Sequence, residues 1–259
     1  MSTTAVRALI AYRSLLRDLV ARDLKVRYKR SVLGIAWTML NPLLMMLVFT
    51  VVFSKILRVP VENFTVYFLS AFILWNFVAQ TTSWSTGCLL GYAPLLRKIY
   101  VPKATLVLAS VLAGLVNLVL SLLPLALVML IVRHPFRASL TFLPVPVLLT
   151  TCFALGLSLL LAPLSVVFVD IVPIYQVLLT IWLYATPVMY PAEIVPPAYH
   201  PLVAANPMTY LVETFRAPIY AGTLPVAHVV LLAAAFSTGM LILGWTVFER
   251  YGDRLAYYV

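Results

Sequence analysis

The stretch Arg22–Trp37 reads RDLKVRYKRSVLGIAW and decides the fold class. Its basic residues end at Arg30, and a nearly uncharged segment follows from Gly34 to Leu57. About 20 apolar residues cross the hydrocarbon layer of a membrane, and Lys and Arg concentrate on the cytoplasmic side of such a crossing. The stretch therefore predicts a membrane span that starts at the cytoplasmic face.

The composition of the whole chain agrees with a membrane protein. The 259 residues are 63% hydrophobic and only 10% charged, whereas soluble domains average about 25% charged residues. The net charge is +10, and eight of the 18 basic residues lie between Arg7 and Arg30, directly before the first span. This placement indicates membrane topology and attraction to anionic lipid rather than nucleic-acid binding.

Hydropathy along the chain predicts an all-α polytopic fold with six transmembrane helices, which form a single domain over residues 1–259. The predicted spans are Gly34–Leu57, Thr65–Leu90, Ala104–Val132, Leu143–Val169, Pro173–Met189 and Val226–Phe248.

The basic residues between the spans predict that both termini lie in the cytoplasm. That arrangement places eight basic residues before the first span, three in the loop 91–103 and two after the last span on the inner side, against five outside. The five outer ones are Lys55, Arg58, Arg133, Arg137 and Arg216. Arg133 and Arg137 oppose the rule locally, so the loop that holds them is the weakest part of this assignment.

The N-terminal segment 1–32 predicts an amphipathic helix at the cytoplasmic membrane surface. From residue 7 to 22, apolar side chains recur on one helical face and charged ones on the other, which is typical of a helix in the interface plane. An ordinary solvated helix is the alternative. The phase fails after Arg22, because Asp23 and Arg27 would fall on the apolar face, so a bend or a connector is expected there. The basic residues assigned to this interfacial segment are Arg13, Arg17, Arg22 and Arg27.

Two connecting segments differ from simple loops. Residues 189–225 hold seven prolines together with Glu193, Glu213 and Arg216, a mixture that predicts a re-entrant helical hairpin on the outer side, before the last span. In the loop 91–103, GYAPLLRKIYVPK, two prolines bound a short segment with an apolar and a basic side. That segment suits either a docking helix for a cytoplasmic partner or an ordinary basic loop.

Catalytic, metal and nucleotide signatures are missing from the sequence. No glycine is followed by lysine, so there is no GxxxxGK phosphate loop. His134, His200 and His228 are far apart and lack metal-ligand spacing. Cys88 and Cys152 sit in apolar sequence, as small buried side chains do, and Asp170 fits a helix end in a tight turn better than an ion path.

Aromatic residues deep in the predicted spans suit either of two roles. Aromatic faces pack on the apolar faces of sugar rings, and they also pack helices together. The deep aromatic residues are Phe49, Phe53, Tyr175, Trp182 and Tyr184.

Four segments together resemble the permease subunits of ABC-2 type exporters, in the branch that exports polysaccharides such as O-antigen and teichoic acid. They are RDLKVRYKRSVLGIAWTMLNPLL (22–44), LLRKIYVPK (95–103), ATPVMYP (185–191) and ANPMTYLVETFR (205–216). One departure is Val169, where the family usually has an arginine before the aspartate.

The resemblance implies a homodimer in the cell's inner membrane that moves a lipid-linked polysaccharide and takes part in lipopolysaccharide biosynthesis. It implies two ATP-binding subunits that carry ATP and Mg, so that this chain is not itself an enzyme and holds no cofactor. Spans one and five would line a channel, and the five deep aromatic residues would be the side chains that face it. The implied coupling helix comprises Leu95, Leu96, Arg97, Lys98, Ile99 and Tyr100. The implied outer gate includes Tyr190, Glu193, Asn206, Glu213 and Arg216.

Two other functions remain open. The same fold could export a lipid or a drug. Alternatively, the chain could be a membrane-embedded enzyme that acts on a lipid-linked sugar, with Glu193 and Glu213 as its candidate carboxylates.

Overall fold

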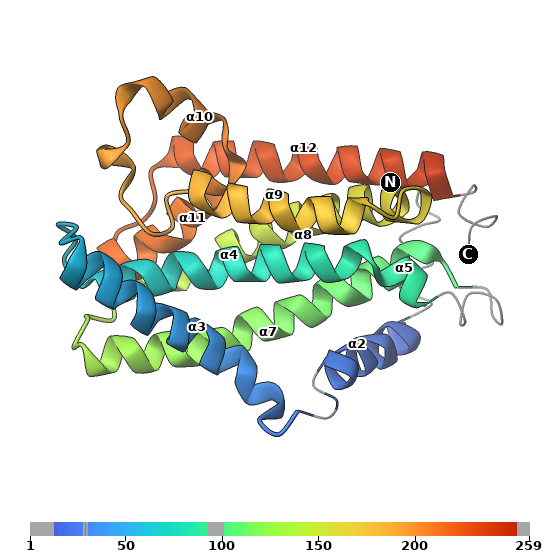
Figure 1. The fold of residues 1–259 in the computed structure, drawn as a ribbon, viewed down its shortest axis with the longest axis horizontal. Helices are drawn as coiled ribbons and strands as arrows, with labels where there is room; N and C mark the ends of the chain where they lie inside the picture. The colour runs from blue at the N-terminus through green and yellow to red at the C-terminus, as the bar shows by residue number, and fades with distance from the viewer. Residues whose placement is uncertain (1–12, 28, 30, 93–100, 253–259) are drawn as a thin grey trace.

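The computed structural model describes residues 13–27, 29, 31–92 and 101–252, and helices are the only regular secondary structure in that part of the chain. The predicted coupling residues 95–100 lie outside the described residues. The elements form one elongated bundle, with α2 (Arg13–Arg27) and α5 (Cys88–Gly91) at one end and α10 (His200–Ala205) and α11 (Pro207–Arg216) at the other (Figure 1).

Five of the six predicted spans are helices long and apolar enough to cross a membrane. The first joins η1 (Gly34–Ala36), α3 (Trp37–Phe49) and the π-helical η2 (Thr50–Ile56), and the others are α4 (Phe64–Thr86), α7 (Lys103–Ile131), η3 (Ala138–Phe142) with α8 (Pro144–Val167), and α12 (Ala227–Gly252). The hydropathy prediction of these five is confirmed.

The sixth predicted span is a shorter apolar helix, α9 (Ile171–Ala185). Its 15 residues rise about 22 Å, which is less than the roughly 30 Å of the hydrocarbon layer. The predicted span reached Met189 because Pro187–Met189 are apolar, but these residues form a buried turn. Asp170 is exposed in the turn before α9, as a helix-end residue is.

The centre of the bundle is α4. Most of its residues are buried, because α3, α7, α8, α9 and α11 all pack against it. Its apolar residues therefore surround the whole helix rather than forming one stripe. Phe68, Phe153 and Phe215 are among the largest fully buried side chains, and they come from α4, α8 and α11.

Among the described helices, α8 and α12 pack together most extensively. Gly156 and Gly244 face each other, and a Cβ atom on either would collide with the opposite backbone. The sequence pattern GxxxG at Gly87 and Gly91 marks no such contact, since nothing lies near either glycine. Gly87 instead separates α4 from α5, as a turn residue does.

The predicted bend after Arg22 is wrong, because α2 is one continuous helix to Arg27. Asp23 does lie on the buried face, with 6% of its surface exposed. It is tolerated there because Tyr92 and Ser110 donate hydrogen bonds to its two carboxylate oxygens. A buried carboxylate with such partners needs no break in the helix.

The segment 189–225 folds into short helices. These are η4 (Ala192–Ile194), η5 (Pro197–Tyr199), α10, α11 and η6 (Ala217–Ala221). Of these, α11 is largely buried against α4, α8 and α12. Whether the segment re-enters a membrane stays a prediction.

Candidate functional site

The described side chains form three polar clusters within the apolar bundle. The first surrounds Arg216 at the C-terminal end of α11. One guanidinium nitrogen donates to the Tyr67 hydroxyl at 2.8 Å, and the other donates to the Pro187 carbonyl at 2.7 Å and the Val188 carbonyl at 3.3 Å. The guanidinium carbon also lies 3.9 Å from the centre of the Tyr67 ring. Tyr67, Pro187, Val188 and Arg216 are called the Arg216 cluster below.

The Arg216 cluster ties together three parts of the chain. Arg216 is 5% exposed, so its charge is held by α4 and by the turn after α9 rather than by solvent. The Tyr67 hydroxyl donates onward to the Tyr190 carbonyl at 3.0 Å. A buried cation with directed partners on two other elements fixes α11 firmly in place.

Asn206 anchors the other end of α11. Its side-chain oxygen accepts from the Met208 amide at 3.0 Å, as an N-cap does, and from the Trp182 indole at 2.8 Å. Its amide nitrogen donates to the Thr186 hydroxyl at 2.9 Å and the Ala185 carbonyl at 3.2 Å. Two residues of the predicted gate, Asn206 and Arg216, therefore hold α11 against the C-terminal end of α9.

The second cluster joins α2 to α7 and to the end of α5. It consists of Asp23, Tyr92 and Ser110 and is called the Asp23 cluster. Ser110 donates to Asp23 at 3.2 Å, and the Tyr92 hydroxyl donates to the other carboxylate oxygen. The guanidinium of Arg22 lies 4.5 Å from the centre of the Tyr92 ring. These contacts attach α2 to the residue that directly precedes the undescribed loop segment 93–100.

The Tyr92 hydroxyl stays protonated at neutral pH. Burial raises the pKa of Tyr92 above its usual value, and the hydrogen bond and charge of Asp23 raise it further. A neutral phenol can donate to the carboxylate, whereas a phenolate would repel it. Tyr92 therefore keeps the proton that it donates to Asp23.

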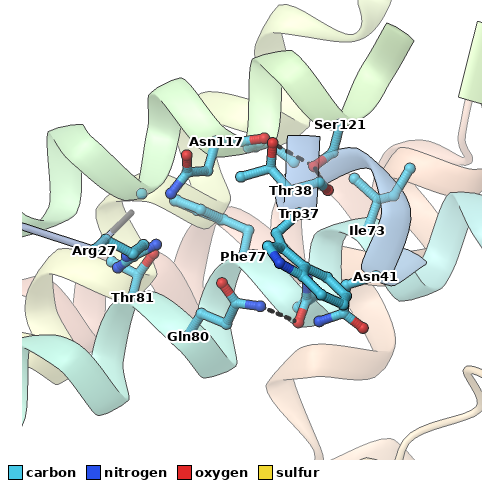
Figure 2. Close-up of a pocket in the computed structure, with 13 residues that line it drawn as sticks. Arg27, Trp37, Thr38, Asn41, Ile73, Phe77, Gln80, Thr81, Asn117 and Ser121 are labelled. Carbon is cyan, nitrogen blue, oxygen red and sulfur yellow. Dashed lines mark hydrogen bonds between the residues drawn. The ribbon is translucent and has the colours of Figure 1, made fainter. Parts of the chain in front are cut away.

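The third cluster is a polar pocket between α2, α3, α4 and α7, with a volume of about 270 Å³. Figure 2 shows carboxamide and hydroxyl groups from three of these helices converging beside the Trp37 ring, with Arg27 at one side. The residues that line it are Arg27, Trp37, Thr38, Asn41, Ile73, Asn76, Phe77, Gln80, Thr81, Gly114, Asn117, Leu118 and Ser121.

The aromatic residues predicted to line a channel differ in how much of each side chain is exposed. Phe49 and Phe53 are half-buried and stack on Phe68 and Phe64. Tyr175 is buried, with its hydroxyl 2.6 Å from that of Thr82. Tyr184 is largely exposed on α9. Their role in a channel stays a prediction.

The remaining predicted residues lie mostly at the surface. Arg13, Arg17 and Arg22 are exposed, whereas Arg27 is half-buried with its guanidinium 5.0 Å from the Trp84 ring centre. Glu193 and Glu213 are exposed, and Tyr190 is half-buried and donates to the Tyr184 carbonyl at 2.7 Å. Among the described residues, no group of three His, Cys, Asp or Glu could hold a metal ion.

Sequence reasoning missed the partners in all three clusters. Tyr67 and Tyr92 were not singled out, and Asp23 was expected to break a helix. Tyr67 lies 149 residues from Arg216, and Tyr92 lies 69 residues from Asp23. The only available signal was the presence of amide side chains within apolar spans, which marks polar packing or function in a membrane.

Comparison with known proteins identifies the family. The profile of the ABC-2 type transporter matches residues 14–220, which cover all three clusters. The chain belongs to the ABC-2 type transporter family. This membership agrees with a multi-pass membrane protein built from apolar helices.

Related proteins cover almost the whole chain of this ABC-2 transporter protein. The O-antigen export system permease protein RfbA of Myxococcus xanthus is 35% identical over 254 residues, which are 97% of each chain. The O-antigen export system permease protein RfbA of Klebsiella pneumoniae is 26% identical over 240 residues, which are 91% of each chain.

Proposed function

We propose that this protein is the permease subunit of an ATP-driven exporter that moves a lipid-linked polysaccharide out of the cytoplasm. The observation that carries the proposal is the 35% identity to an O-antigen export permease over 97% of both chains. The five long apolar helices and the short α9 supply the membrane-spanning body that such a permease requires.

ATP hydrolysis is assigned to a separate subunit. The 259 residues contain no GxxxxGK phosphate loop, and permeases of ABC transporters work with ATP-binding partners. The proposed assembly holds two copies of this chain and two ATP-binding subunits, in the cytoplasmic membrane with both termini inside. The basic residues before the first span support this orientation.

The Asp23 cluster suggests how ATP-driven motion reaches the spans. The proposed coupling helix, residues 95–100, follows Tyr92 after two residues. Tyr92 is bonded to α2 through Asp23, and Ser110 joins the same carboxylate to α7. A displacement of the loop would therefore move α2 and α7 together. At the opposite end, the Arg216 cluster holds α11 against α4, where the proposed outer gate lies.

Two experiments test the proposal. The tagged chain is purified in mild detergent from cells that express the neighbouring genes, and bound proteins are identified by mass spectrometry. We expect an ATP-binding subunit in equal amount, and deletion of the gene should remove polysaccharide from the cell surface. A chain that purifies alone, with unchanged surface polysaccharide after deletion, would contradict the proposal.

The coupling role is tested by changing Leu96→Asp and Tyr100→Asp together. Charges on the apolar side of the proposed coupling helix should abolish docking, because a buried unpaired carboxylate is costly. We expect loss of the ATP-binding subunit on purification and loss of export. Full export by the double variant would refute the assignment of residues 95–100.

A further inference from the structure

The polar pocket between α2, α3, α4 and α7 has the chemistry of a binding site, not only of helix packing. Four carboxamides, Asn41, Asn76, Gln80 and Asn117, line it together with hydroxyl groups, although the surrounding segments are strongly apolar. Polar side chains at membrane depth are costly, and they mark helix–helix hydrogen bonds or a path for a polar ligand.

Helix packing accounts for part of this polarity. Gln80 donates to Asn76 at 2.9 Å within α4, and Ser121 donates to the Asn117 carbonyl at 2.8 Å and to the Thr38 carbonyl at 3.3 Å. The last of these bonds joins α7 to α3. These contacts fix the walls of the pocket and leave other polar groups facing it.

Two side chains that line the pocket have hydrogen-bonding atoms without a partner among the described residues. The Thr81 hydroxyl is buried, with 1% of the residue exposed, and has no hydrogen-bond partner among the described residues. Asn41 lies half-buried on α3, and its carboxamide makes no hydrogen bond to another described residue. The Thr81 hydroxyl lies against Gly114 of α7 rather than open to the pocket, since a Cβ atom on Gly114 would collide with it. The Asn41 carboxamide is therefore the group that we expect to meet a polar ligand.

The charge of the pocket favours an anion. Among the described residues that line it, Arg27 is the only cation and none is acidic. Within the described residues, Arg27 makes no ion pair, and its guanidinium lies beside the Trp84 ring. An arginine with free donors binds phosphate oxygens well.

The remaining lining favours a sugar over an acyl-lipid headgroup. Trp37 is 45% exposed, and Figure 2 shows its ring next to Asn41 and Gln80. An aromatic face beside amides that both donate and accept suits a ring of hydroxyl groups. The volume of about 270 Å³ lies just below the roughly 300–1,000 Å³ of common ligand sites, so it admits one sugar ring and not a polymer.

We propose that the polar pocket binds the sugar–phosphate headgroup of a membrane-anchored glycan, with Arg27 on the phosphate and Asn41 and Asn76 on the sugar ring. The inference rests on the proposed export function and adds a site at which the lipid-linked end of the substrate is recognised. The polymer itself would lie outside this pocket.

A binding assay tests the proposal with the full-length chain in nanodiscs of neutral lipid. The probes are a short polyprenyl diphosphate that carries one hexose, the same lipid without the sugar, and phosphatidylglycerol, and native mass spectrometry measures binding. We expect the sugar-bearing probe to bind at least fivefold more tightly than the other two. Equal binding of phosphatidylglycerol, or no binding of the sugar-bearing probe, would overturn the proposal.

Variants locate the site. Asn41→Ala and Arg27→Gln should each weaken binding of the sugar-bearing probe about five- to tenfold, as expected for the loss of a hydrogen bond. The matched controls Lys25→Gln, on the same helix, and Gln176→Ala, an exposed amide on α9, should not change it. Unchanged binding by both Asn41→Ala and Arg27→Gln would refute the assignment.

Export in cells distinguishes failure of this site from failure of the proposed function. If the wild-type chain does not restore surface polysaccharide to a deletion strain, the export function is wrong. If it does, but Asn41→Ala and Arg27→Gln export as fast as wild type at low substrate supply, only the headgroup site is wrong.

Discussion

Replacing Arg216 by methionine should destabilise the bundle by about 2–4 kcal/mol. The change removes two short charge-assisted hydrogen bonds, to Tyr67 and Pro187, each worth about 1.5–3 kcal/mol. Removal of a buried charge returns part of its desolvation penalty. The acceptors left behind are buried and cannot be solvated in its place, so the loss is expected to exceed the gain.

The assay is thermal unfolding of the purified chain in detergent, followed by tryptophan fluorescence. For a protein of about 150–250 residues, 1 kcal/mol shifts the Tm by about 2–4 °C, so Arg216→Met should lower the Tm by roughly 4–16 °C. The matched control is Arg137→Met. Arg137 is exposed and makes a single bond of 3.3 Å to the Ala221 carbonyl, and such surface changes usually cost less than about 0.5 kcal/mol.

A double-mutant cycle identifies the partner. Tyr67→Phe removes only the hydroxyl that accepts from Arg216 and donates to Tyr190. If the two side chains interact as the structure shows, the double variant should lose less stability than the two single losses combined. The role of the Arg216 cluster would be refuted if Arg216→Met shifted the Tm no more than Arg137→Met and if the stability losses of Arg216→Met and Tyr67→Phe were strictly additive.

Two further predictions concern the helix contacts. Asp23→Ala should lower the Tm by several degrees, because the Tyr92 and Ser110 hydroxyls lose their shared acceptor. Asp23→Ala should also reduce ATP-driven export. The control Asp18→Ala changes an exposed residue of the same helix and should alter neither the Tm nor export. Equal effects of the two changes would count against the Asp23 cluster. Gly244→Ala should destabilise the protein by at least about 1–3 kcal/mol, since its Cβ would meet the Gly156 backbone. Gly239→Ala on the same helix meets nothing and should be neutral or stabilising, so similar Tm values for both glycine variants would contradict the close packing of α8 on α12.

Hydropathy predicted the long helices well because each is determined locally. A helix satisfies its own backbone hydrogen bonds, so an apolar run such as Lys103–Ile131 specifies a span without reference to its neighbours. The prediction was less accurate at α9, where Pro187–Met189 are apolar but form a buried turn. Composition alone does not distinguish burial in protein from burial in lipid.

The candidate sites were predicted only in part. Arg216 was noted as a charged residue in an apolar, proline-rich segment, and the family resemblance placed both Asn206 and Arg216 in the outer gate. The sequence did not indicate that Tyr67 would bind the guanidinium. The continuous helix through Asp23 was also missed, since a carboxylate on an apolar face is unfavourable until Tyr92 and Ser110 are brought to it. Leu95–Tyr100 lie outside the described residues, and their coupling role stays a prediction.

The sequence by itself determined the all-helical membrane fold and the approximate positions of its five long spans. Both follow from the length of each apolar run, which acts over one helix at a time. Only the tertiary structure decided which polar groups meet: Arg216 with Tyr67, Asp23 with Tyr92, and the four amides around the polar pocket. Tyr67 lies 149 residues from Arg216, and Tyr92 lies 69 residues from Asp23. Only the packing of α11 on α4, and of α2 and α5 on α7, brings these two pairs within hydrogen-bond distance.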